Sequence, residues 1–201
     1  TGMEAHAGPT PMALRKDALL AATRIMQDVV AAAHRHPPHG RGTVGMVQVF
    51  PNSRNVIPGR IKFSIDLRNS TDTLVDAMAA EVKAFADQVA KEHGVQVHIE
   101  MVSSYPAQLF QPECVQAVGR AAAKLGYSHM PAVSGARHDA VYMAKLAPSG
   151  MIFIPCKDGI SHNEIEDAKP EHIEAGCNVL LHAMLERAGL GAISVSYTHL
   201  T

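Results

Sequence analysis

The polar side chains at 157–166 are the densest group in this sequence that could do chemistry. They follow a short apolar run, Ile152–Ile154, which is typical of a buried strand and ends at Pro155. Open α/β sheets bind ligands beyond the carboxyl ends of such strands. Within the group, His162 is the residue that could bind a metal ion as a neutral imidazole near pH 7. A lone histidine is a weak signal, so a role in capping the loop stays open.

The composition of the 201-residue chain argues against several classes of function. Basic and acidic side chains nearly balance, 18 against 19, which argues against binding to nucleic acid or to a membrane surface. No apolar run approaches the length of a membrane span. Three widely spaced cysteines suit a reducing compartment better than disulfides, so we expect a cytoplasmic protein.

Hydrophobic periodicity in the first half of the chain predicts two helices and four strands. Apolar residues three and four positions apart predict helices at about 11–33 and 72–93. The predicted strands are the end of one at 1–6 and three more at 43–50, 60–68 and 95–101. This order is the ferredoxin-like arrangement, in which a four-stranded antiparallel sheet carries both helices on its apolar face.

The segment 60–68 shows the clearest alternation. Its apolar residues point one way and its polar residues the other, so it predicts a strand with one buried face and one face in solvent. Arg68 ends the polar row, where its charge can face a ligand without disturbing the core. Asn55 lies at the turn that enters this strand, so we expect Asn55 and Arg68 to approach one pocket.

The second half alternates helices with short strands after a hinge near 103–106. The predicted helices are 112–125, one from 140, and 170–188, and the predicted strands lie near 131–133 and at 152–154. Alternation of this kind predicts a parallel sheet covered by helices. Two strands are too few for an independent domain, so further strands are expected upstream of Thr1. The tail 191–201 continues no pattern and is expected to be non-native.

Four short polar motifs follow one another along the chain. They are Ala5–Met12 with Arg15 and Asp17, Asn55–Gly59 with Asp66–Arg68, Ser134–Ala140, and Ser161–Glu164 with Glu166. As an ordered set covering residues 1 to about 188, they resemble the carbamoylase-type amidohydrolases of the M20 metallopeptidase clan. That group includes N-carbamoyl-L-amino acid hydrolases, β-ureidopropionases and allantoate amidohydrolases.

The resemblance implies an α/β fold of two domains. Residues 1–105 would form a ferredoxin-like βαββαβ lid and dimerisation domain, and 106–190 the C-terminal part of an α/β metallopeptidase-like catalytic domain. In this family the lid interrupts the catalytic domain, which would explain the incomplete sheet. The chain is then expected to be a fragment that lacks the N-terminal half of the catalytic domain, and to form a homodimer through the lid.

The resemblance also implies roles for five residues. His162 matches the family's last metal ligand. His6 matches a lid histidine that reaches a substrate in the neighbouring subunit, and His138 matches a substrate-contacting histidine of the catalytic domain. Asn55 and Arg68 match the lid residues that hold the substrate's carboxylate.

The implied activity is metal-dependent hydrolysis of the ureido group of N-carbamoyl-L-amino acids or related ureido acids. Two divalent ions, Zn²⁺, Mn²⁺, Co²⁺ or Ni²⁺, would activate a bridging water, and an upstream Glu would act as general base and then acid. His6 and His138 would donate hydrogen bonds to the developing oxyanion. Since His162 is at most one metal ligand, this chain alone is expected to be inactive.

Two other functions remain open. One is an aminoacylase or dipeptidase of the same clan, and the other is a non-catalytic dimerisation module. The motif at Ser134–Ala140 and the pair of Asn55 and Arg68 favour the carbamoylase branch. Arg137 departs from the family, which usually has glycine there, and so affects the pocket expected beside His138.

Each candidate residue also has a purely structural interpretation. His6 could cap the first helix, and Arg68 could pair with Asp66 or Asp72 on the surface, where an ion pair contributes little stability. Asp139, beside His138, could cap a helix.

Overall fold

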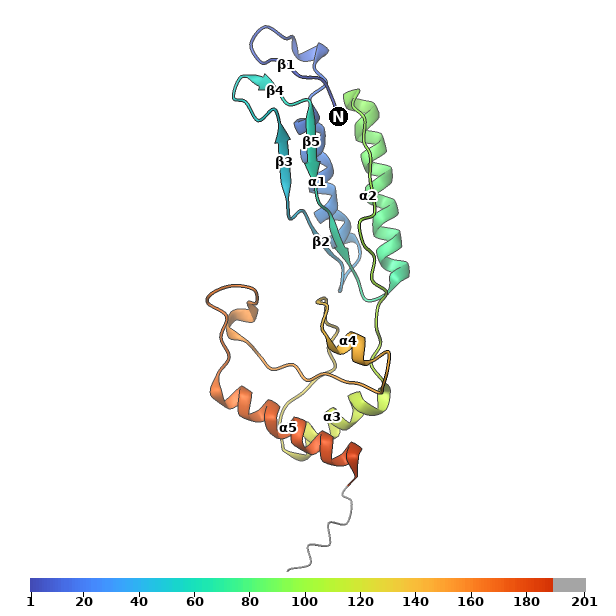
Figure 1. Cartoon of the computed structure of the whole chain (residues 1–201), viewed down its shortest axis with the longest axis vertical. Helices are drawn as coiled ribbons and strands as arrows, with labels where there is room; N and C mark the ends of the chain where they lie inside the picture. Colours follow the sequence, from blue (N-terminus) through green and yellow to red (C-terminus); the bar gives the residue numbers. More distant parts are fainter. Residues whose placement is uncertain (190–201) are drawn as a thin grey trace, which may run out of the picture. The chain divides into compact units, whose positions relative to one another are not determined.

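The computed structural model describes residues 1–189, which belong to two compact units (Figure 1). Unit 1 spans Thr1–Ala107, and unit 2 begins at Gln108. The tail predicted to be non-native, 191–201, lies outside the described residues. No helix in the described part of the chain is long and apolar enough to cross a membrane.

Unit 1 contains two long helices that lie side by side (Figure 1). Helix α1 is Ala18–Arg35 and helix α2 is Asp72–His93. The first begins later than predicted because Asp17 caps it, accepting hydrogen bonds from the amides of Leu19 and Leu20. The residues before that cap form a separate 3-10 turn, η1, at Met12–Leu14.

The strands of unit 1 are short and pair two by two. They are β1 Ala5–His6, β2 Arg41–Thr43, β3 Val47–Phe50, β4 Val56–Ile57, β5 Arg60–Phe63 and β6 Asp66–Arg68. Three antiparallel pairs form in the described residues, β1 with β4, β2 with β6 and β3 with β5.

The predicted strands 43–50 and 60–68 are therefore each divided in two, and the single four-stranded sheet was wrong for the described residues. The two divisions lie opposite each other, where the amide of Ser64 donates to the carbonyl of Met46 at 3.0 Å. The alternation in 60–68 is confirmed, because its apolar residues are more buried than its polar neighbours throughout.

The segment 95–101 was also predicted as a strand and is not one. Gln96 exchanges two hydrogen bonds with Thr1 at 2.7 and 2.8 Å, and the amide of Val95 donates to the carbonyl of Ala90 in the preceding helix at 3.0 Å. Val95 and Val97 nevertheless pack against the core formed by the two helices. The apolar pattern thus predicted burial correctly at Val95 and Val97 but not at Ile99 and Met101, which are 46% and 72% exposed, and it did not predict that the hydrogen-bonded ladder is missing.

Close contact between β2 and α1 fixes the strands on the helices. A Cβ atom at Gly42 would lie 2.2 Å from the carbonyl oxygen of Val29, so only glycine fits there. Beside this contact Val29, Ala32 and Val82 form a buried cluster, which is covered by Leu67 of β6 and by Val44 and Ile65, at the two breaks between strands.

Unit 2 is helical in its described part. Its elements are α3 Pro112–Lys124, α4 Ala140–Met143, η2 Lys157–Gly159 and α5 Pro170–Ala188. Helices α3 and α5 pack together through Ala117, Ala121, Ala122, Val179 and Ala183. The helices predicted at 112–125 and 170–188 are confirmed.

The strands predicted near 131–133 and at 152–154 are absent from the described part of unit 2. A strand requires hydrogen bonds to a neighbouring strand, and these segments have none to pair with here. Several apolar side chains of the unit are exposed, among them Phe153 at 51% and Leu181 at 54%. The buried core of unit 2 therefore lies between α3 and α5, while other apolar side chains of the unit remain exposed.

Candidate functional site

His6 lies in β1 and is exposed, with its ring turned back onto the following turn. Its Nδ1 atom lies 3.0 Å from the amide nitrogen of Gly8. Because a backbone N–H can only donate, Nδ1 accepts, and the neutral ring carries its hydrogen on Nε2. Helix capping by His6 was a wrong alternative, since the side chain of Asp17 caps α1.

Asn55 lies beside His6. The residue after Asn55, Val56, pairs with His6 across β1 and β4, and the amide of Ala7 donates to the carbonyl of Asn55 at 2.8 Å. The Asn55 side chain is exposed, and its Oδ1 accepts a hydrogen bond from Ser53 at 3.0 Å. The structure thus brings His6 and Asn55 together at one end of the strands.

Arg68 forms a two-pronged ion pair with Asp66. Its Nε and one terminal nitrogen each lie 2.8 Å from a different carboxylate oxygen of Asp66. Both side chains are about half exposed. Hydrogen bonding from Arg68 holds the pKa of the Asp66 carboxyl below its usual value and raises the pKa of the guanidinium. The surface pair with Asp66, which the sequence left open, is what the structure forms.

Asn55 and Arg68 do not approach one pocket within a single chain. Asn55 precedes β4, near one end of unit 1, whereas Arg68 ends β6, which pairs with β2 toward the other end (Figure 1). An extended chain rises about 3.3 Å per residue, so the run from 60 to 68 alone spans roughly 25 Å. The predicted shared pocket was wrong because the two residues flank this run instead of folding back together.

The register also reveals a residue that the sequence did not single out. Arg41 pairs directly with Arg68 across β2 and β6, and both are exposed. Like charges facing each other on paired strands are unfavourable unless anions lie nearby. The sequence could not identify Arg41, because the residue that faces Arg68 depends on the register between two strands, and alternation along one strand does not reveal that register.

In unit 2, His138 follows the loop that begins at Ser134. Its ring is half-buried, lies 5.4 Å from the ring of Phe153 and has its Nε2 atom 2.7 Å from the hydroxyl of Ser134. Asp139 occupies the N-cap position of α4 but makes no capping hydrogen bond. The structure therefore does not support a capping role for Asp139.

Arg137, the departure from the family pattern, packs on α4. Its guanidinium lies 5.0 Å from the ring centre of Tyr142 and donates a hydrogen bond to the hydroxyl of that residue. The substitution for glycine thus adds an arginine–tyrosine stack to the loop that carries His138.

His162 is exposed and lies in the left-handed region, with φ at +58°. Its amide donates to the Glu166 carboxylate at 2.9 Å. Among the residues that the structure describes, no three His, Cys, Asp or Glu side chains form a group that could hold a metal ion. The residues present therefore do not fit a two-metal centre, and His162 alone cannot organise one.

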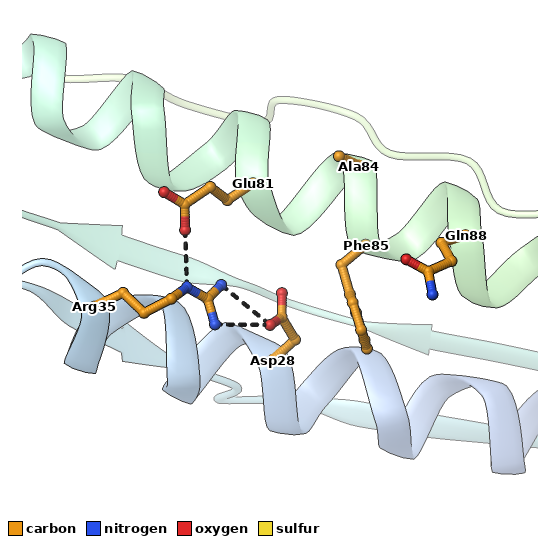
Figure 2. Close-up of a pocket in the computed structure, with 6 residues that line it drawn as sticks. All are labelled: Asp28, Arg35, Glu81, Ala84, Phe85 and Gln88. Carbon is orange, nitrogen blue, oxygen red and sulfur yellow. Dashed lines mark hydrogen bonds and ion pairs between the residues drawn. The ribbon is translucent and has the colours of Figure 1, made fainter.

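A shallow groove between α1 and α2 contains none of the predicted site residues (Figure 2). Arg35 bridges it, with Nε 3.0 Å from Glu81 and both terminal nitrogens 3.1 Å from Asp28. Hydrogen bonds from His36 and then Arg35 hold the pKa of Glu81 below its usual value. Arg35 thus links the two helices across the groove, although both of its hydrogen bonds to Asp28 go to Oδ1, and the buried Oδ2 has no hydrogen-bond partner among the described residues.

Comparison with known proteins now identifies the family. The model of peptidase family M20/M25/M40 matches residues 4–186. The chain belongs to this family. The resemblance deduced from the four motifs is confirmed, as is the assignment to a mixed α/β family fold.

The relatives of this M20-family chain include ureido-hydrolysing enzymes. It is 46% identical over 188 residues to an N-carbamoyl-L-amino-acid amidohydrolase of Rhizobium meliloti, covering 94% of this chain and 45% of that protein. It is 30% identical over 183 residues to an allantoate amidohydrolase of Bacillus subtilis, covering 91% and 44% respectively. The chain spans about half the length of these curated relatives.

A solved structure agrees with the family assignment. The crystal structure of an amidase of the hydantoinase/carbamoylase family from Burkholderia multivorans superposes with a TM-score of 0.89 at 54% identity. The match covers 94% of this chain and 46% of that one. Proteins of this family are typically metal-dependent.

Proposed function

We propose that this chain is part of a metal-dependent amidohydrolase that hydrolyses the ureido group of N-carbamoyl-L-amino acids or related ureido acids. The observation that carries the proposal is the 46% identity to an N-carbamoyl-L-amino-acid amidohydrolase over 94% of the chain. The reaction cleaves a linear, non-peptide C–N bond. Its products are the amino acid, carbon dioxide and ammonia.

In the proposed reaction His6 and His138 donate hydrogen bonds to the carbonyl oxygen of the ureido group. Donors held in place before the reaction stabilise the negative charge that develops there. Arg68 and Asn55 hold the carboxylate, for which a planar guanidinium is well suited because it pairs with both oxygens.

The distance between Asn55 and Arg68 supports a site shared between two copies of the chain. His6 and Asn55 lie together, whereas Arg68 lies at the far end of the strand run. A small acid can contact both groups only if they come from different copies. We therefore propose a homodimer formed through unit 1, acting as the lid, in which His6 and Asn55 of one copy complete a site that contains Arg68 of the other.

The metal ions, proposed to be two of Zn²⁺, Mn²⁺, Co²⁺ or Ni²⁺, require ligands beyond His162. Since the described residues supply no further ligand group, we propose that the other ligands and the general base come from outside these 201 residues. No step of the reaction is assigned to the metals from the residues present.

Ammonia release tests the function and separates it from the alternatives. A version extended to the length of the relatives should release ammonia from an N-carbamoyl-L-amino acid, lose this activity in a chelator and regain it with Zn²⁺ or Mn²⁺. The 201-residue chain should release none. Preferential cleavage of N-acyl amino acids or dipeptides by the extended protein would instead indicate an aminoacylase or dipeptidase. No turnover of any of these would favour a non-catalytic dimerisation module.

A further inference from the structure

The hydroxyl of Ser134 lies within reach of three polar groups of its own loop. Its Oγ atom is 3.1 Å from the amide nitrogen of Ala136, 3.5 Å from the carbonyl oxygen of Ala136 and 2.7 Å from Nε2 of His138. A serine hydroxyl has one hydrogen to donate and two lone pairs with which to accept. The three contacts therefore compete for a known number of donors and acceptors.

The distances favour one position for the hydroxyl hydrogen. The Ala136 amide can only donate, so it occupies one lone pair of Oγ. The contact of 2.7 Å to His138 has the normal length for a hydroxyl donor, whereas 3.5 Å to the Ala136 carbonyl is too long for a good hydrogen bond. The short contact therefore favours the hydroxyl as the donor to Nε2 over the opposite direction, in which Nε2–H would donate to the second lone pair of Oγ. Because Nε2 accepts, the hydrogen of the neutral ring is on Nδ1.

Phe153 restrains the same ring from a second segment of unit 2. The ring centres of His138 and Phe153 are 5.4 Å apart, and the rings are tilted by 59°. Tilted contacts between rings have a preferred geometry, so rotation of the imidazole would disturb this packing as well as the Ser134 hydrogen bond. The orientation of His138 is therefore set by two independent contacts.

We propose that Ser134 is a positioning residue that holds neutral His138 as the Nδ1–H tautomer, so that Nδ1 is the donor offered to the substrate. The tautomer is inferred from the loop contacts alone, whereas its use on the ureido carbonyl rests on the proposed function. His6 has the opposite tautomer, because its Nδ1 accepts from Gly8. The two histidines thus offer different ring nitrogens to the substrate.

Nitrogen-15 NMR of the histidine side chains tests the tautomer in the 201-residue chain itself. Long-range ¹⁵N–¹H spectra at pH 8, where an ordinary imidazole is neutral, distinguish the two tautomers. His138→Gln assigns the signals among the 12 histidines. We expect an Nδ1–H pattern in the wild type, a mixture of tautomers in Ser134→Ala, and recovery in Ser134→Thr, which restores the hydroxyl.

Two controls distinguish the loss of the Ser134 hydrogen bond from a general loss of structure. Ser149→Ala removes a hydroxyl that donates to the Ala147 carbonyl and should leave the His138 spectrum unchanged. His129 has its Nδ1 atom 3.1 Å from the Tyr127 carbonyl, which can only accept, so its Nδ1–H pattern should persist in every variant. An Nε2–H pattern for His138 in the wild type, or an unchanged His138 spectrum in Ser134→Ala, overturns the proposal.

Kinetics of the extended enzyme test the use of the tautomer. Loss of the ring's orientation should lower kcat roughly 10- to 100-fold in Ser134→Ala, with KM little changed and with rescue in Ser134→Thr. An unchanged kcat in an otherwise active enzyme would refute the role of the Nδ1 donor, even if NMR supports the tautomer. An inactive wild type would instead refute the proposed function and leave the NMR result standing.

Discussion

The candidate residues are held by hydrogen bonds made within the chain. Arg68 pairs with Asp66, Asn55 accepts from Ser53, and His6 accepts from Gly8. Exposed ion pairs contribute only about 0–1 kcal/mol, so a substrate carboxylate can replace Asp66 at Arg68 at little cost. The pair therefore orients the guanidinium without preventing it from binding a ligand.

Substitution of Arg68 tests whether this residue binds the substrate's carboxylate. Removing one partner of a desolvated ion pair costs about 2–5 kcal/mol, or roughly 30- to several thousand-fold in affinity. In the extended enzyme, Arg68→Ala should lower kcat/KM by that order on an N-carbamoyl amino acid, with the metal content and Tm nearly unchanged. Arg68→Lys should rescue only partly, since a point charge cannot make the two-pronged contact.

The carboxamide analogue of the substrate is the control for Arg68→Ala. It has no carboxylate, so its turnover should change little. Equal losses of kcat/KM on the acid and on the carboxamide would show that Arg68 does not bind the carboxylate.

At the scale of elements, the sequence predicted the helices better than the strands. Helix α2 was found from its apolar spacing, and its end is fixed by Gly94 in the left-handed conformation at φ +63°. Strand pairing depends on partners distant in sequence. The alternation at 60–68 therefore predicted which side chains are buried, but not the break between β5 and β6 or the partner of Arg68. The candidate residues could be chosen from motifs, because a motif is local in the sequence. The separation of Asn55 from Arg68 could not be predicted, because it depends on how the strands pair.

The contact of β2 with α1 predicts a strong effect of a small substitution. In Gly42→Ala the added methyl would meet the Val29 carbonyl, a backbone atom that cannot turn away, so we expect a loss of about 1–3 kcal/mol of stability. Gly45→Ala is the matched control, because its Cβ would lie 3.7 Å from the Ser64 hydroxyl, an ordinary contact. Urea unfolding measures both, and equal midpoints for the two variants would contradict the close packing.

The link between α1 and α2 at Glu81 predicts a dependence of stability on pH. The hydrogen bonds from His36 and Arg35 lower the folded-state pKa of Glu81, so their stabilisation is complete above the ordinary glutamate pKa of about 4.3. It is lost as the pH falls through the lowered value. Because these groups are partly exposed, Glu81→Gln should cost no more than about 1 kcal/mol at pH 7.

Urea unfolding at pH 7 and at pH 3 measures this difference. The cost of Glu81→Gln should shrink at the lower pH, where the wild-type carboxyl begins to protonate. Asp87→Asn, which removes the more exposed pair with Lys83 within α2, should cost less at pH 7. A cost for Glu81→Gln that stays constant between the two pH values would rule out the ionic link.

At the scale of the whole molecule, the proposed site depends on residues that one chain cannot bring together. His6 and Asn55 lie at one end of unit 1 and Arg68 at the other, so a shared substrate requires two copies. A two-fold dimer then contains two equivalent sites, each with contributions from both copies. Neither a His6→Ala dimer nor an Arg68→Ala dimer has an intact site.

Coexpression of these two variants, in the version extended to the length of the relatives, tests whether the site is shared between the two copies. Random pairing makes half of the dimers mixed, and each mixed dimer has one site with wild-type His6 and Arg68, so about a quarter of all sites are intact. We predict that ammonia release from an N-carbamoyl-L-amino acid recovers to about a quarter of the wild-type rate, although each variant alone is nearly inactive. Recovery no greater than the sum of the two variants measured separately would contradict the shared site.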